Sequence, residues 1–177
     1  MNKILFILFL GLFTPAAMGA EGHSHEPYVG SAPFEKLKKL EGIWTGTVTE
    51  GDKTDSQQPT EVIYEVSSGG SAVVEKLFSG ASEEMVSVYN DEKGELVMTH
   101  YCMLKNQPKL KLKSAGENQI ELEFTEANGV AVTDPHMHAL RITFEGPDAM
   151  KQEWYGYENG KWSETPTTVL LKRGAAQ

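Results

Sequence analysis

Apolar and polar residues alternate with a period of two along most of the chain after residue 42. In Gln119–Thr125, for example, Ile120, Leu122 and Phe124 are separated by glutamates. Successive side chains of a β-strand point to opposite faces, so this pattern predicts strands with one packed face and one solvated face. Ten segments follow it: Ile43–Glu50, Glu61–Ser67, Ala72–Ser79, Met85–Tyr89, Leu96–Leu104, Lys109–Lys113, Gln119–Thr125, His138–Glu145, Lys151–Tyr157 and Thr167–Lys172.

A helical period occurs once, before the first strand. Ser31 and Pro33 form a cap and first-turn pair, and apolar residues follow at 34, 37 and 40 with lysines between them. The predicted helix ends near Gly42. Short strands at close spacing, separated by turn signals such as Asn159-Gly160, predict an all-β protein. We expect a closed antiparallel meander barrel of about 8–10 strands with one short N-terminal helix.

The first twenty residues predict export. Lys3 is followed by the apolar run Ile4–Phe13 and then by small residues, which is typical of a secretory signal peptide. Cleavage after Gly19 and cleavage after Ala20 both fit. The run is too short for a spanning helix, which needs about 20 apolar residues. We therefore expect a periplasmic or extracellular protein without a membrane span.

The remainder is predicted to hold a flexible polar tail at residues 21–30 and one barrel domain at residues 31–174. The formal charge is −9, and loss of Lys3 with the signal peptide makes it −10. A domain this acidic and without a basic stripe is a poor partner for nucleic acid, so no nucleic-acid partner is expected. Nothing in the sequence predicts an oligomeric state.

The segment that contains Gly42-Ile43-Trp44 resembles the opening of a lipocalin-like, calycin-type barrel. In that family a short helix leads into Gly-x-Trp on the first strand, and a basic residue of the last strand stacks on the tryptophan. The resemblance implies that Gly42 and Trp44 are structural and that Arg173 or Lys172 is the stacking partner. A cation over an indole ring contributes about 0.5–2 kcal/mol.

Two further blocks, Thr99-His100-Tyr101-Cys102 and His136-Met137-His138, resemble a family of exported bacterial proteins that share the Gly-x-Trp opening. That resemblance implies the fold and no activity. The nitrobindin-like haem barrels also open with Gly-x-Trp but take their iron ligand from a histidine close to the C-terminus. No histidine follows His138 here, so haem is a weaker expectation than copper or zinc.

The candidate chemistry lies in these blocks. Residues i and i+2 of a strand share a face, so His100 and Cys102 form one candidate pair and His136 and His138 another, each on a packed or lumen-facing side. Imidazole and thiolate suit copper or zinc. Core residues without a metal are the alternative, because buried polar groups are satisfied by hydrogen bonds or water.

His23 is a separate candidate, because cleavage after Ala20 would leave Glu21-Gly22-His23 as a terminus that can bind Cu²⁺. A disordered polar tail is the alternative for this segment.

Three functions stay open at this stage. The leading hypothesis is an exported barrel that binds a small apolar molecule, or a metal ion, through His100, Cys102, His136 and His138. The second is an enzyme that acts on a lumen-bound molecule through the same cluster, with Cys102 as a thiol nucleophile and a histidine as its base. The third is a structural or interaction barrel with a filled core. The sequence identifies no catalytic residue.

Overall fold

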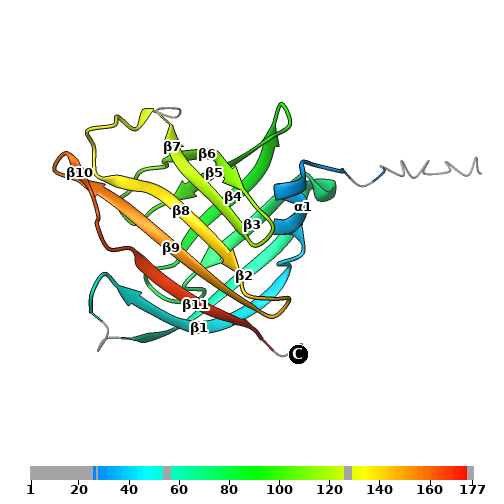
Figure 1. Ribbon diagram of the computed structural model, residues 1–177, viewed down its shortest axis with the longest axis horizontal. Coiled ribbons are helices and arrows are strands. Elements are labelled where there is room, and N and C mark those ends of the chain that lie inside the picture. The colour runs from blue at the N-terminus through cyan, green and yellow to red at the C-terminus, as the bar shows by residue number, and fades with distance from the viewer. Residues whose placement is uncertain (1–25, 27, 54–56, 126–128, 175–177) are drawn as a thin grey trace, which may run out of the picture.

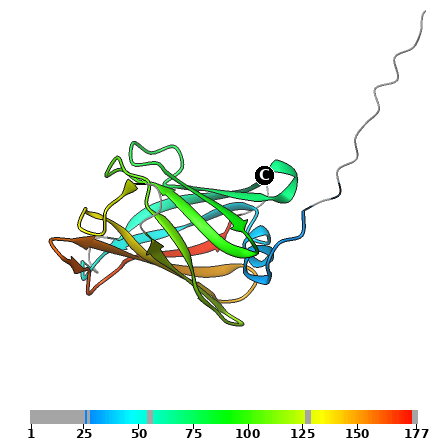
Figure 2. The ribbon, with the colours of Figure 1, turned by 90° about the horizontal axis from the view of Figure 1, so that it is seen from above.

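A computed structural model of the chain describes residue 26 and residues 28–53, 57–125 and 129–174. The predicted signal peptide and His23 lie outside the described residues. Within them the chain forms the all-β closed antiparallel meander barrel of ten strands, with one short N-terminal helix, that the sequence predicts (Figures 1 and 2). No helix of the described residues is long and apolar enough to cross a membrane.

Neighbouring strands of the barrel are mostly neighbours in the sequence. They pair in the order β11-β1-β2-β3-β4-β5-β6-β7-β8, and β9 closes the barrel by pairing with both β8 and β11. The two-residue strand β10 (Lys161–Trp162) pairs with β9 alone. The ten barrel strands are β1 (Gly42–Glu50), β2 (Gln58–Ser67), β3 (Ala72–Leu77), β4 (Met85–Glu92), β5 (Glu95–Tyr101), β6 (Lys109–Ala115), β7 (Gln119–Thr125), β8 (His136–Phe144), β9 (Ala149–Glu158) and β11 (Thr167–Arg173).

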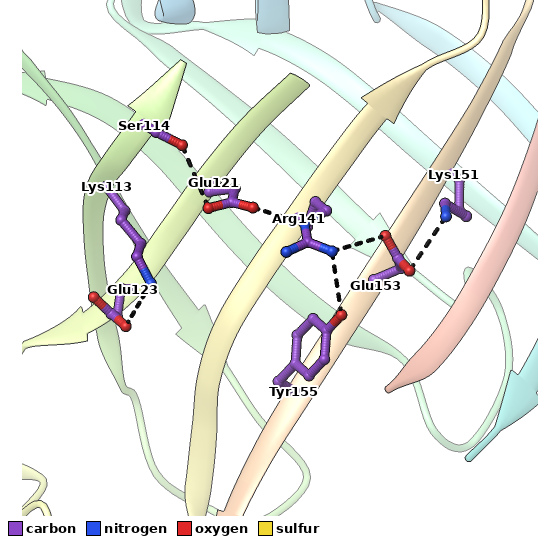
Figure 3. Close-up of polar contacts among 8 residues, drawn as sticks. All are labelled: Lys113, Ser114, Glu121, Glu123, Arg141, Lys151, Glu153 and Tyr155. Carbon is purple, nitrogen blue, oxygen red and sulfur yellow. Dashed lines mark hydrogen bonds and ion pairs between the residues drawn. The ribbon is translucent and has the colours of Figure 1, made fainter. Parts of the chain in front are cut away.

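Alternation along the strands separates an apolar interior from a charged outer wall. Val62, Leu96, Ile120 and Leu140 represent the buried side chains of four different strands. On the outside, neighbouring strands carry ion pairs that Figure 3 shows. Among them Arg141 Nε lies 2.7 Å from a carboxylate oxygen of Glu121. Exposed pairs of this kind contribute about 0–1 kcal/mol each, so burial of the apolar faces is the main source of stability.

One end of the barrel is covered by α1 (Ala32–Lys38), as Figure 1 shows. Ser31 caps the helix, since its hydroxyl accepts from the Phe34 N–H at 3.4 Å, and the same hydroxyl donates to Asp91 at 2.8 Å. Phe34 and Leu37 are fully buried on the barrel side. A short 3₁₀ turn, η1 (Ser68–Gly70), lies at this end too, and Gly69 O accepts from the Tyr28 N–H.

Trp44 and Arg173 lie at the same end, opposite each other in the β1–β11 pair. The Arg173 guanidinium is 4.5 Å from the centre of the Trp44 ring. It also donates to the carbonyls of Lys39 and Glu41, both at 2.9 Å, and so ties the end of the helical segment to the last strand. Trp44 Nε1 donates to Leu40 O at 2.7 Å.

Gly46 explains why β1 and β11 can approach so closely. A Cβ atom at this position would lie 1.8 Å from Leu170 O, which is far inside van der Waals contact. Only a residue without a side chain fits there, so Gly46 permits the strand pairing that closes the barrel.

Two departures from the predicted strands affect the candidate site residues. The predicted strand Leu96–Leu104 ends earlier, because β5 stops at Tyr101 and the chain turns back, with Lys105 N–H donating to Cys102 O at 2.9 Å. In β8 the pairing with β9 shifts between Met137 and Ala139, so His138 is an extra, bulged residue.

Candidate functional site

The end of the barrel away from α1 holds a cavity of about 600 Å³. It is formed by the last residues of β1, β3, β5 and β9 and the first residues of β2, β4, β8 and β11. Most of its wall is apolar: Val48, Leu77, Phe78, Met85, Met103, Met137, Trp154 and Val169. Glu50, Glu61 and Glu83 add carboxylates, and His100 is the one histidine of the described residues on the wall. The cavity has the size and the mixed lining of a small-molecule pocket.

His100 is held by its strand neighbours and is fully buried. Its Nδ1 lies 3.0 Å from the hydroxyl oxygen of Ser87, the residue directly opposite on β4. The Trp154 ring packs against the imidazole with 4.9 Å between ring centres. The other ring nitrogen of His100, Nε2, is buried without a hydrogen-bond partner. Burial lowers the pKa of His100 to about 4, so the side chain is neutral at pH 7.

A buried polar group lies beneath this wall, centred on Glu75 of β3. We call Tyr64, Glu75, Tyr89 and Gln152 the Glu75 cluster; all four are buried. The Tyr64 hydroxyl donates to the carboxylate at 2.5 Å, the Tyr89 hydroxyl donates at 2.8 Å, and Gln152 Nε2 donates as well. Burial raises the pKa of Glu75, and hydrogen bonds from these three residues and from Ser87 oppose that rise. The carboxyl group is thus fully partnered.

The Glu75 cluster is connected to two of the ring side chains that line the cavity, Trp154 and His100. Trp154 Nε1 donates to Gln152 Oε1 at 3.1 Å, which fixes the indole. Ser87 lies opposite Glu75 in the β3–β4 pair and contacts His100 through the same hydroxyl. The positions of Trp154 and His100 therefore depend on one connected set of buried side chains.

His136 and His138 contact each other and do not line the cavity, whereas Met137 between them does. His136 Nδ1 lies 2.5 Å from Asp134 O, and since a carbonyl only accepts, this nitrogen carries the proton. His136 Nε2 lies 3.0 Å from His138 Nδ1. His138 also lies beside the half-exposed Trp162, with 5.0 Å between ring centres.

Cys102 follows β5 and is half-buried. Burial raises the pKa of its thiol, while a backbone hydrogen bond from Leu104 opposes this. A raised pKa keeps the sulfur protonated at neutral pH, which is the reverse of what a thiol nucleophile needs. Its backbone N–H donates to Asn106 O at 3.1 Å within the turn.

The four predicted site residues therefore separate into three places. His100 lines the cavity, Cys102 lies in the turn after β5, and His136 and His138 form their own pair. In the described part of the chain no group of three or more His, Cys, Asp or Glu side chains is placed to hold a metal ion. Binding of copper or zinc, with haem as the weaker case, stays a prediction of the sequence.

The Glu75 cluster was not among the site residues predicted from the sequence. The sequence did contain a signal for it, because Glu75 lies between Val73 and Leu77 at a spacing of two and therefore shares the buried, apolar face of their strand. Gln152 stands in the same way between Met150 and Trp154. Glu75 and Gln152 are both polar residues at positions where the period of two predicts a buried side chain.

No protein-family model and no curated protein matches this chain. Among solved structures, the chain is similar to the crystal structure of Rv2717c from M. tuberculosis, with 19% identity, 83% of this chain and 100% of that chain covered, and a TM-score of 0.49. It is also similar to a redesigned beta barrel, with 13% identity, coverage of 78% and 95%, and a TM-score of 0.33.

Proposed function

We propose that this protein binds a small, largely apolar molecule in the cavity of its barrel, with His100 as the polar group that orients it. The observation that carries the proposal is the pairing of an apolar cavity of about 600 Å³ with a buried, unpartnered ring nitrogen on its wall. A filled structural barrel would not contain an apolar cavity of this size.

The energetics favour an occupant. A buried polar atom without a partner costs about 1–3 kcal/mol, and a ligand group that bonds to His100 Nε2 would recover this. Apolar surface of the ligand adds about 25 cal/mol for each Å² removed from water. Met103 and Met137 border the same space, and methionine side chains adapt their shape to different contents.

The proposal also includes export, because a ligand-binding barrel with a signal peptide would act in the periplasm or outside the cell. Native mass spectrometry of the chain purified from that compartment, compared with its denatured mass, would reveal a retained ligand. The denatured mass would also show whether cleavage follows Gly19 or Ala20.

Binding is tested with N-phenyl-1-naphthylamine, a neutral apolar probe whose fluorescence rises in an apolar site. Val169 lines the cavity and is buried, whereas Leu170, the next residue of β11, is 43% exposed on the outer wall. Val169→Phe fills part of the cavity, and Leu170→Phe adds the same ring outside it. We expect Val169→Phe to weaken probe binding about tenfold, which corresponds to about 1.4 kcal/mol, and Leu170→Phe to leave it unchanged.

Val48→Phe, on the neighbouring strand β1, is a second filling variant in case Val169→Phe does not fold, as judged by far-UV circular dichroism. Equal probe affinity in the wild type and in a folded filling variant would refute binding in this cavity. Absence of binding by the wild type would refute the proposed function.

A further inference from the structure

The hydrogen bonds around His100 define which kind of polar group the cavity accepts. Ser87 links His100 to Glu75, because its hydroxyl oxygen lies 3.0 Å from His100 Nδ1 and its residue is opposite Glu75 in the β3–β4 pair. A hydroxyl group has a single proton and two lone pairs. Ser87 can therefore donate its proton either to the Glu75 carboxylate or to the His100 imidazole. Which of the two accepts the proton determines the tautomer of the His100 ring.

The carboxylate is the stronger acceptor for that proton. Hydrogen bonds to a charged group are about twice as strong as those between neutral groups. Ser87 lies directly opposite Glu75 in the β3–β4 pair, both side chains are buried, and Ser87 opposes the burial that raises the pKa of this carboxyl, as a proton directed at the carboxylate does. Tyr64, Tyr89 and Gln152 donate to the same group, so all of its partners point their protons inward.

With its own proton directed to Glu75, Ser87 offers only a lone pair to His100 Nδ1. That nitrogen must then carry the hydrogen of the neutral ring. A neutral imidazole has one N–H, so Nε2 is left as a bare acceptor. Nε2 is one of three buried side-chain polar atoms of the described residues that have no hydrogen-bond partner, with Thr60 Oγ1 and Asn106 Oδ1. At His100 the cavity wall therefore lacks a donor and not an acceptor.

We propose that the ligand carries a hydrogen-bond donor, an alcohol, phenol or N–H group on an apolar frame, which donates to Nε2 of His100. The inference rests on the proposed function and adds the class of ligand to it. His100 is fully buried, so neighbouring wall side chains must move for the donor to reach the ring. Ser87 and Glu75 act as positioning residues that set the tautomer from inside the barrel.

Three ligands of equal heavy-atom count separate the alternatives: 1-dodecanol as donor, 2-dodecanone as acceptor only, and methyl undecyl ether as a weaker acceptor. Each competes with N-phenyl-1-naphthylamine for the chain. One hydrogen bond to an otherwise unpartnered buried atom is worth about 1–3 kcal/mol, so we expect the alcohol to bind about 5- to 150-fold more tightly than the ketone and the ether. Equal affinities, or a preference for the ketone, would overturn the inference while leaving ligand binding intact.

Two variants show whether His100 and its tautomer cause the preference. His100→Phe keeps a ring against Trp154 but removes Nε2, so the alcohol should lose its advantage over the ketone and the ether; the N–H of the probe loses the same acceptor, so the affinities are compared among the three ligands only. Ser87→Ala removes the group that fixes the tautomer, and the ring can then present either an N–H or a lone pair. The difference in affinity between the alcohol and the ketone should therefore be smaller in Ser87→Ala than in the wild type. A preference that persists in His100→Phe would assign it to another wall residue and refute the inference. If neither the probe nor any of the three ligands binds the wild type, the proposed function itself fails.

Discussion

Acidification should destabilise this barrel through His100, and the size of the effect follows from its burial. The pKa of an unfolded histidine is about 6.5, and burial lowers the pKa of His100 to about 4 in the folded chain. Between these values the unfolded state binds the additional proton, so the free energy of unfolding falls as the pH drops from about 6.5 to about 4. Each pKa unit corresponds to about 1.36 kcal/mol, which gives about 3 kcal/mol over this window.

The assay is urea unfolding at several pH values between 7 and 4, followed by tryptophan fluorescence, for the wild type and for His100→Phe. Glu75 changes stability in the opposite direction, since a carboxyl with a raised pKa loses stability as the pH rises. Glu75 and the surface carboxylates are present in both proteins, so they largely cancel in the difference between the two free energies. That difference should change by about 3 kcal/mol in favour of the variant as the pH falls from 7 to 4.

A difference that stays constant within about 0.5 kcal/mol over the whole range would refute the reasoning, because additive and independent effects fall within that margin. It would mean that the imidazole takes up its proton in the folded barrel as easily as in water. The cavity wall would then be open to solvent at His100.

Two further outcomes are expected. Gly46→Ala should destabilise the chain by about 1–3 kcal/mol or prevent barrel closure, because its Cβ would overlap Leu170 O; Gly116→Ala, where nothing lies within 4 Å, should stay within about 0.5 kcal/mol in thermal unfolding. Equal melting temperatures for the two variants would contradict this account of Gly46. His138→Phe should change the affinity of N-phenyl-1-naphthylamine by less than about twofold, since His138 does not line the cavity. Loss of probe binding would instead include the His136–His138 pair in the site.

The fold could be predicted from the sequence because it depends on a pattern repeated over ten strands. Each strand must bury one face, and a period of two identifies that face wherever the strand is regular. The helix was readable for a similar reason, since Ser31 and Pro33 mark its start. Strand ends were less predictable: Cys102 continues the apolar alternation of β5, yet backbone hydrogen bonds turn the chain at that residue.

The candidate site could be predicted only in part, and the reason is local. His136 and His138 have the same parity as Leu140, but a single bulged residue in β8 interrupts the alternation before Leu140, and no residue type in the sequence marks this bulge. Glu75 could not be distinguished in the sequence from the many other acidic residues, most of which are exposed to solvent. Whether a carboxylate on an apolar face finds donors depends on strands far away in the sequence, as the contact between Glu75 and Gln152 illustrates.

The helix at the closed end has a kinetic consequence. Phe34 and Leu37 are buried at that end of the barrel, and the cavity lies at the other end, so we expect one route into and out of the cavity. A bound molecule would leave by the route through which it entered, so a competitor could bind only after the first molecule has dissociated. In a stopped-flow exchange experiment the replacement rate should therefore reach a plateau equal to the spontaneous escape rate, however much competitor is added. The residence time of the ligand is then set by its own dissociation rate and not by the concentration of competitor.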